Sequence, residues 1–370
     1  MNTLEKKRLL LFIAIAFGFD LLMCIPMWIG FKLGQDLSGF ATAQMTYPAC
    51  GVFLGYLLFG KKEKKIPRIS IILFLIVSAA TVLVSLLPVA FTGKISYSVY
   101  LILNYILLAG NLIVYIMFWA CGKEKRRSIG LSRNNILLSA LYITLFIVLF
   151  YGQIYVGYIP QILFYGVDGN IIINFTKSIL NVGYIRSAAF ILALFPISFI
   201  GYLGEEYGWR YYLQPVLQKK YGLRAGVVIL GVVWGLWHAG LDFMLYTRET
   251  GPQMLVRQVI ACIAFGIFFG YVYMKTKNIW ALSLIHFINN NFLTIGSGGA
   301  INPEAIQNNT ITWSQVLLSI VSCVVFWIFI FAPAYNKKNK DAVLSEYPLF
   351  DEGKVPDSED NIAAENLNVV

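Results

Sequence analysis

The stretch GEEYGWRYYL, residues 204–213, places two adjacent glutamates and an arginine directly after a long apolar run. That run, AAFILALFPISFIGYL, occupies residues 188–203 and has the composition of a membrane-spanning helix. Ionisable side chains at membrane depth are costly, and they usually face the interior of a helical bundle or a wet cavity. Glu205, Glu206 and Arg210 are therefore the first candidates for a functional site.

The composition of the whole chain points to a membrane protein. Of the 370 residues, 58% are hydrophobic and 13% are charged, and the charged share is about half that of an ordinary soluble domain. Apolar runs of about 20 residues recur along the chain, and in lipid such runs form helices because the backbone must satisfy its own hydrogen bonds. We therefore expect an all-α, polytopic transmembrane helical bundle of about ten spans. The predicted spans are residues 9–31, 39–59, 69–91, 97–121, 135–158, 184–208, 225–245, 255–274, 279–295 and 312–334.

The distribution of positive charge predicts the topology. Of the 29 Lys and Arg residues, 23 lie in every second connecting segment, beginning with the N-terminal Lys6, Lys7 and Arg8. The positive-inside rule then places these segments and both termini in the cytoplasm. The net charge of +10 belongs to this topology, so we expect anionic membrane lipid as a partner and no nucleic acid.

Other features of the chain exclude several classes of function. The five cysteines lie in apolar spans without a CxxC pair, which indicates packing residues rather than disulfides or a thiolate zinc site. There is no G-x-x-x-x-G-K-[ST] loop, so ATP-driven transport has no support. The first span has no cleavage site after it and is interpreted as a retained helix. The connection 159–183 is expected to lie partly in the membrane interface.

The only two histidines, His238 and His286, both lie in late predicted spans. A single interior histidine is more often a hydrogen-bonded structural residue, but two of them beside a Glu-Glu pair favour a site. Glu206 and Arg210 are four residues apart and share a helix face, so the arginine can pair with that carboxylate. Glu205 is rotated by one residue and is free to face another group.

The same spacing recurs in the later motifs. Trp234 and His238 are four residues apart, as are His286 and Asn290. Counted from the flanking basic residues, the glutamate pair and both histidines fall in the cytoplasmic half or near the middle of the bilayer, so they can meet in one cavity. A carboxylate with imidazoles in such a cavity can activate water, and an amide and an imidazole can donate hydrogen bonds to a developing oxyanion.

These motifs, taken in order, resemble those of a known family. They are Glu205-Glu206-x-x-x-Arg210, an aromatic four residues before His238, and His286-x-x-x-Asn290. The chain resembles the CPBP family over residues 184–295. These are the CAAX-processing and bacteriocin-processing intramembrane proteases, also called the Abi family. The family usually shows Phe-x-x-x-His in the second motif, where this chain has the sequence WGLWH, residues 234–238.

The resemblance implies a role for each residue in the first two motifs. Glu205 would be the general base that activates the hydrolytic water, and His238 would also hold that water. Glu206 and Arg210 would organise the site. The resemblance implies that residues 184–295 are the catalytic helical core. The apolar spans and the composition predict N-terminal transmembrane helices in residues 1–183, the last transmembrane helix in 296–340 and a tail in 341–370. The tail holds 8 of the 19 acidic residues and is expected to be disordered.

The third motif supplies the expected oxyanion site, and a bound zinc ion is an open possibility. By the resemblance, His286 and Asn290 would stabilise the oxyanion of the tetrahedral intermediate. Zinc is left open as a cofactor, with Glu205, His238 and His286 as its candidate ligands, although the same residues also suffice for a metal-free mechanism. Asp242, one turn after His238, is a candidate to orient that imidazole, and a plain structural carboxylate is an equal alternative.

The resemblance also implies a substrate class. Eukaryotic relatives cut after a prenylated C-terminal cysteine, and bacterial ones are associated with bacteriocin maturation or self-immunity. We therefore expect a peptide or a lipidated protein as substrate. The Ile-, Asn- and Lys-rich composition, without an organelle-targeting segment, favours a bacterial plasma membrane.

Two alternatives from other classes stay open at this stage. One is a non-catalytic membrane scaffold or bacteriocin self-immunity factor with the same fold. The other is a secondary transporter, whose intramembrane carboxylates and histidines relay protons, but no paired, symmetry-related halves are found. A protease predicts that the polar groups converge on one water, whereas a transporter predicts a polar pathway that reaches both sides.

Overall fold

The structure of the chain is a computed structural model that describes residues 3–59, 65–92, 96–295 and 307–349. All regular elements in these ranges are helices, which confirms the predicted all-α class. Seven helical segments there are long and apolar enough to cross a membrane. The helices Val182–Ala193 and Phe195–Tyr221, bent by 67° at their junction, make an eighth if they form one span. The chain is therefore a multi-pass membrane protein.

The predicted number of ten spans is not confirmed. The span expected at 39–59 is divided into α3 (Ser38–Gln44) and α4 (Tyr47–Phe59), which are too short to cross singly. The span expected at 279–295 is α16 (Ile279–Ile295), a helix of 17 residues. The cytoplasmic position of both termini stays a prediction.

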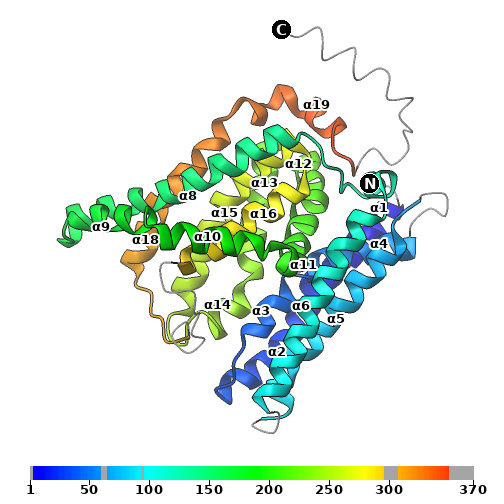
Figure 1. The fold of residues 1–370 in the computed structure, drawn as a ribbon. Coiled ribbons are helices and arrows are strands. Elements are labelled where there is room, and N and C mark those ends of the chain that lie inside the picture. The colour runs from blue at the N-terminus through cyan, green and yellow to red at the C-terminus, as the bar shows by residue number, and fades with distance from the viewer. Residues whose placement is uncertain (1–2, 60–64, 93–95, 296–306, 350–370) are drawn as a thin grey trace.

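The N-terminal helices form one side of the bundle (Figure 1). The first of them contains a π-helical segment, Ala14–Phe19, between α1 and α2. A π-helical turn replaces the usual i to i+4 bonding pattern, and such turns are frequent at functional sites. On this side α4 contacts α1, the π-helical segment and α5, and α5 contacts α2, α3 and α6. The elements are α1 (Thr3–Ile13), α2 (Asp20–Lys32), α3, α4, α5 (Arg68–Ala90), α6 (Tyr97–Ala120) and α7 (Lys123–Ser128).

Helix α11 (Phe195–Glu206) lies between the two sides of the bundle, because it contacts α4 and α6 on one side and α16 on the other. Its approach to the N-terminal helices depends on Gly204. A Cβ atom at this position would lie 2.3 Å from the carbonyl oxygen of Met45 and 2.8 Å from the Cα of Thr46. The turn between α3 and α4 therefore packs directly on the α11 backbone, one residue before Glu205.

We expect Gly204→Ala to lower the free energy of unfolding by about 1–3 kcal/mol or more, because the added methyl meets backbone atoms that cannot rotate away. Unfolding by sodium dodecyl sulfate in mixed micelles, followed by circular dichroism, measures the change. Gly152→Ala in α8 is the matched control, since a Cβ there meets nothing within 4 Å. An equal unfolding midpoint for Gly204→Ala and wild type would contradict the close packing.

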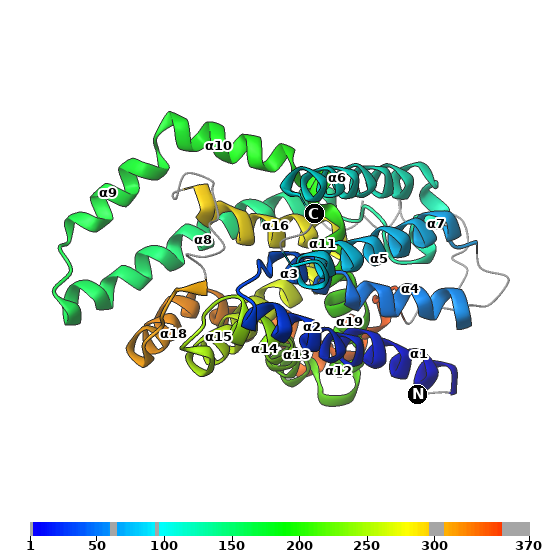
Figure 2. The same ribbon diagram turned by 90° about the horizontal axis from the view of Figure 1, so that it is seen from below.

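Three helices form an arm that extends from the bundle in both views (Figures 1 and 2). They are α8 (Ile136–Tyr165), α9 (Asn170–Ile179) and α10 (Val182–Ala193). No residue of α9 or α10 is buried. The connection predicted at 159–183 is therefore mostly helical. Phe175 of α9 packs against Tyr151, Tyr155 and Tyr158 of α8, and this contact holds the tip of the arm together.

The later helices form the other side of the bundle. Helix α15 is central there, because it packs against α13, α14 and α18. The larger buried cluster of aromatic and aliphatic side chains runs from Phe12 near the N-terminus to Tyr347 near the end of the described chain, and a second cluster joins α2 and α3 to Leu241 and Met244. The elements are a π-helical segment (Tyr207–Leu213), α12 (Gln214–Tyr221), α13 (Leu223–Trp237), α14 (Ala239–Met244), α15 (Gly251–Thr276), α16, α18 (Trp313–Trp327) and α19 (Lys340–Ser345).

The start of the predicted disordered tail is ordered instead. Residues 340–345 form α19, which contacts α12. Tyr347 is fully buried; its hydroxyl donates to Gln218 Oε1 at 2.6 Å and accepts from Gln214 Nε2 at 3.1 Å. Glu346 also pairs with Lys277 at 2.9 Å. The prediction of disorder is therefore wrong for residues 341–349, because an aromatic side chain finds a buried polar partner, and residues 350–370 lie outside the described residues.

We expect Tyr347→Phe to lower the free energy of unfolding by about 1–3 kcal/mol, because it leaves two buried amides without their shared hydroxyl. The exposed Tyr221→Phe is the control and should unfold at the wild-type midpoint. Detergent unfolding of both variants makes the comparison. If the two variants unfold alike, the hydroxyl of Tyr347 does not hold the C-terminal segment.

Candidate active site

Four helical elements deliver the candidate residues to one buried place. Glu205 and Glu206 end α11, and Arg210 follows in the π-helical segment Tyr207–Leu213. His238 directly follows α13, and His286 lies in α16. Their exposed fractions are 2% for Glu205, 0% for Glu206 and Arg210, 8% for His238 and 4% for His286.

Glu206 forms the centre of an ionic chain. Its Oε2 lies 3.1 Å from Arg210 Nε, so the predicted i,i+4 pair is present. Its Oε1 lies 2.8 Å from Nδ1 of His286, which comes from a helix 80 residues further along the chain. A buried charge is costly unless an opposite charge pairs with it, and the Arg210 nitrogens have no hydrogen-bond partner among the described residues besides this ion pair. Glu206 therefore holds Arg210 and His286 in place, and it is the less available of the two carboxylates for chemistry.

Glu205 has a different environment. Its Oε2 accepts a hydrogen bond from the indole Nε1 of Trp234 at 2.7 Å. Oε1 has no hydrogen bond to any residue in the described part of the chain, so it is available to a water molecule. The two adjacent glutamates thus have different partners: Glu206 pairs with Arg210 and His286, and Glu205 keeps one oxygen without a hydrogen bond to the described residues.

The orientation of His238 defines which of its nitrogens faces the site. Nδ1 lies 2.8 Å from the main-chain carbonyl oxygen of Trp234. A carbonyl only accepts hydrogen bonds, so Nδ1 carries the proton and a neutral ring has its lone pair on Nε2. Trp234 lies between the two imidazoles, with ring-centroid distances of 6.0 Å to His238 and 5.6 Å to His286.

Asn290 is placed differently from the other candidates. It lies one turn after His286 but is exposed, and its Oδ1 accepts a hydrogen bond of 2.9 Å from Asn289 Nδ2. Its expected part in the oxyanion site stays a prediction. The neighbouring Asn291 instead donates to Tyr202 at 2.8 Å, and the Tyr202 ring packs edge-on against His286. The sequence motif gave no signal for Tyr202 or Asn291.

Asp242 does not orient His238. Nδ1 of the imidazole bonds to the Trp234 carbonyl. Neither carboxylate oxygen of Asp242 has a hydrogen-bond partner among the described residues, although the side chain is fully buried. That hypothesis is therefore wrong, because the histidine at the end of α13 bonds back to its own helix.

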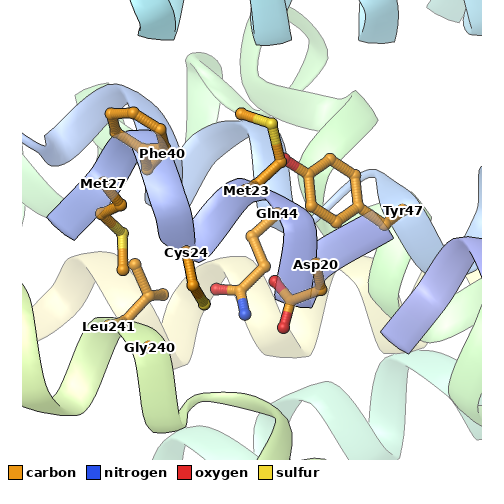
Figure 3. A pocket seen from close by; sticks show the side chains of 9 residues that line it. All are labelled: Asp20, Met23, Cys24, Met27, Phe40, Gln44, Tyr47, Gly240 and Leu241. Carbon is orange, nitrogen blue, oxygen red and sulfur yellow. The ribbon is translucent and has the colours of Figure 1, made fainter. Parts of the chain in front are cut away.

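The N-terminal helices support the site from behind. Gln44 Nε2 donates to the carbonyl oxygen of Trp237 at 2.8 Å, and the Trp237 indole donates to the carbonyl of Ala16 in the first π-helical segment at 2.7 Å. Figure 3 shows the Asp20 carboxyl group beside the Gln44 amide, in a small pocket that also contacts Gly240 of α14. Trp237, the residue before His238, is thus held by two residues that are 193 and 221 positions away in the sequence, and no local motif predicts these contacts.

The side chains of the described residues do not form a metal-binding cluster. Among the residues that the structure describes, no three His, Cys, Asp or Glu side chains come close enough to hold a metal ion. Of the candidate set, His286 turns Nδ1 to Glu206 and Glu205 turns one oxygen to Trp234. These donors do not form a ligand cluster, so the proposal below uses no metal.

The fold and the buried site together define a multi-pass membrane protein with a carboxylate and two imidazoles inside the helical bundle. Residues 187–292 match the model of the family described as type II CAAX prenyl endopeptidase Rce1-like. The chain is also similar to the CAAX prenyl protease 2 of Methanococcus maripaludis, with 28% identity over 154 residues that cover 39% of this chain. Both comparisons confirm the resemblance to the CAAX protease family.

The matches cover only part of this chain and part of its relative. The alignment spans 53% of the length of the archaeal relative, about half of it. No solved structure gives a significant match. The matched segment contains all three motifs, whereas Ala16 and Gln44, which support the site from behind, lie outside it.

Proposed function

We propose that this chain is an intramembrane endopeptidase that hydrolyses a peptide bond with a water molecule activated by Glu205. The observation that carries the proposal is the buried Glu205 carboxylate, with one oxygen held by Trp234 and the other free. Two imidazoles flank the same indole ring. A polar group buried in this way activates water more strongly than it would in bulk solvent, because competing water is excluded.

The reaction follows from the available atoms. A water bound between Glu205 Oε1 and His238 Nε2 loses a proton to Glu205, and its oxygen attacks the carbonyl carbon of the substrate. The carbonyl π electrons move to oxygen and form the tetrahedral intermediate. When that intermediate collapses, the C–N bond breaks and Glu205 returns the proton to the leaving amine. The net reaction consumes one water and yields one carboxyl and one amino terminus.

His286 is the proposed donor to the oxyanion. Its Nδ1 bonds to Glu206 at 2.8 Å, so Nε2 can also donate only in the imidazolium form. That charge, with Arg210, balances the two carboxylates and makes the buried group neutral. Asn290, exposed one turn later, would assist only after its side chain turns away from Asn289. Glu206 and Arg210 hold the imidazole of His286 in position.

We further propose that the substrate is a membrane-associated or lipidated protein cut near its C-terminus. The support is the match of residues 187–292 to the type II CAAX prenyl endopeptidase Rce1-like family. The position of the site inside a multi-pass membrane protein also suits a substrate that is itself tethered to the bilayer. A bacterial plasma membrane stays the proposed location.

A defined peptide tests the substrate. The purified protein in liposomes is incubated with a peptide that ends in a prenylated Cys-a-a-X sequence, and products are identified by mass spectrometry. The expected result is release of the last three residues, with slower cleavage of the same peptide without its prenyl group. Cleavage of neither peptide would contradict the CAAX-type substrate, and equal cleavage of both would contradict lipid recognition.

A further inference from the structure

Trp234 contacts four of the five charged or titratable groups of the site, all except Glu206. Its indole Nε1 donates to Glu205 at 2.7 Å, and its carbonyl oxygen accepts from His238 Nδ1 at 2.8 Å. The guanidinium carbon of Arg210 lies 4.5 Å from the centre of the Trp234 ring. The edge-on contact with His286 completes the set. The side chain is 3% exposed, so these contacts are shielded from water.

We propose that Trp234 is the positioning residue of the site and that its indole N–H sets the orientation of the Glu205 carboxylate. The inference rests on the proposed function. It goes beyond the family motif, because the usual phenylalanine at this place has an aromatic ring but no N–H group. The chain therefore uses a hydrogen bond to its general base that a phenylalanine cannot make.

The Glu205 carboxylate needs a partner that limits its rotation. A glutamate has three side-chain torsions, and a base must hold its proton-accepting oxygen within about 3 Å of the water it activates. The Trp234 hydrogen bond occupies Oε2 and leaves Oε1 as the carboxylate oxygen without a hydrogen bond to the described residues. Hydrogen bonds to ionised groups are stronger than neutral ones, and they are stronger still in a buried place.

The remaining contacts explain why the indole itself is well placed. The Arg210 guanidinium lies over the ring face, and Phe269 lies under the same cation, with 5.3 Å between the guanidinium carbon and the Phe269 ring centre. Arg210 is in turn fixed by Glu206. The indole of Trp234 is thus held by Arg210 and Glu206, the same residues that position His286. The Trp234 ring also lies between Glu205, the proposed general base, and both histidines.

The variant Trp234→Phe isolates the N–H, because the aromatic ring and the main-chain carbonyl to His238 both remain. We expect kcat for peptide cleavage to fall about 10- to 100-fold, the usual effect of losing a hydrogen bond to a charged group, with KM within about twofold. Trp280→Phe is the matched control, since it removes another buried indole N–H, bonded to the Leu131 carbonyl at 2.9 Å and away from the site. It should keep the wild-type kcat.

An isosteric replacement excludes an effect of the smaller ring. Benzothienylalanine at position 234 keeps the bicyclic shape and replaces the N–H with sulfur, so it should lower kcat as much as phenylalanine does. The proposal is overturned if either variant at position 234 cleaves at the wild-type rate. It is overturned equally if the rates of Trp234→Phe and Trp280→Phe fall by the same factor.

A spectroscopic measurement separates this proposal from the proposed function. The chain has eight tryptophans, and 15N labelling of their indoles gives one N–H resonance each. The resonance lost in Trp234→Phe is assigned to Trp234, and it should move in Glu205→Gln because a neutral amide replaces the carboxylate acceptor. If it moves in a protein that cleaves nothing, the positioning contact stands and the protease function fails. If it does not move, the positioning contact is absent whatever the activity.

Discussion

Glu205→Gln is expected to lower the rate of cleavage of the prenylated test peptide by about 10²- to 10⁴-fold, the usual contribution of a general base. The amide has the same shape but cannot accept the proton of the attacking water. It can still accept the Trp234 hydrogen bond through its carbonyl oxygen, so the site should keep its geometry. The measurement is the initial rate in liposomes with equal amounts of folded protein.

The control for this variant is Glu249→Gln. Glu249 is exposed in the connection between α14 and α15, and its conversion to the amide should leave the rate unchanged. A Glu205→Gln protein that cleaves as fast as wild type would show that another group activates the water. In that case Glu206, which forms an ion pair with Arg210 and a hydrogen bond with His286, would have to be released to take the role.

Arg210→Met is expected to cause the largest loss of stability, about 3–5 kcal/mol, because it leaves the Glu206 carboxylate buried with one partner fewer. Both side chains of this pair are completely buried, so water cannot replace the missing cation. Methionine is close in volume, which keeps the loss of packing small. Unfolding by sodium dodecyl sulfate in mixed micelles measures the change.

Two further variants test whether the loss of stability in Arg210→Met comes from the buried ion pair. Arg186→Met removes an exposed cation from α10 and should unfold at the wild-type midpoint. The double variant Glu206→Gln with Arg210→Met removes both charges, so its loss should be less than the sum of the two single losses. Strict additivity, or a wild-type midpoint for Arg210→Met, would contradict a structural role of the buried pair.

The parts of the site that the sequence predicted are those that depend on short spacing. The pair of Glu206 with Arg210 follows from residues four apart on one helix, and the structure contains it. The convergence of the glutamates with His238 and His286 follows from comparable depths in successive spans. The all-α class follows from composition, because a chain this apolar has few alternatives to helices in lipid.

The remaining features depend on contacts between distant segments. His286 bonds to a glutamate 80 residues earlier, and Gln44 bonds to a carbonyl 193 residues later. The bond from Trp234 to Glu205 crosses between two helices, so the motif showed only an aromatic side chain. Hydropathy also failed to predict that α3 and α4 are separate, because an average over an apolar window does not detect a break at which the chain packs on Gly204 and Pro48 lies in the first turn of the next helix.

The start of the tail is a further feature that depends on contacts between distant segments, because composition predicted disorder where the chain is ordered. Polar composition with two prolines predicted disorder from residue 341, yet Tyr347 is buried between Gln214 and Gln218. A single aromatic residue with a suitable buried partner is enough to order the segment around it, and composition averaged over thirty residues does not detect it.

The central claim is that this chain cuts a membrane-associated protein with a water activated by Glu205. Its most direct test compares wild type with Glu205→Gln at equal levels in matched membranes, by mapping the N- and C-terminal peptides of all membrane proteins. We predict new paired termini that are present only with the wild type, and their sequences will identify the substrate. Identical maps from the two folded proteins would contradict proteolysis and would favour a non-catalytic role in binding a partner.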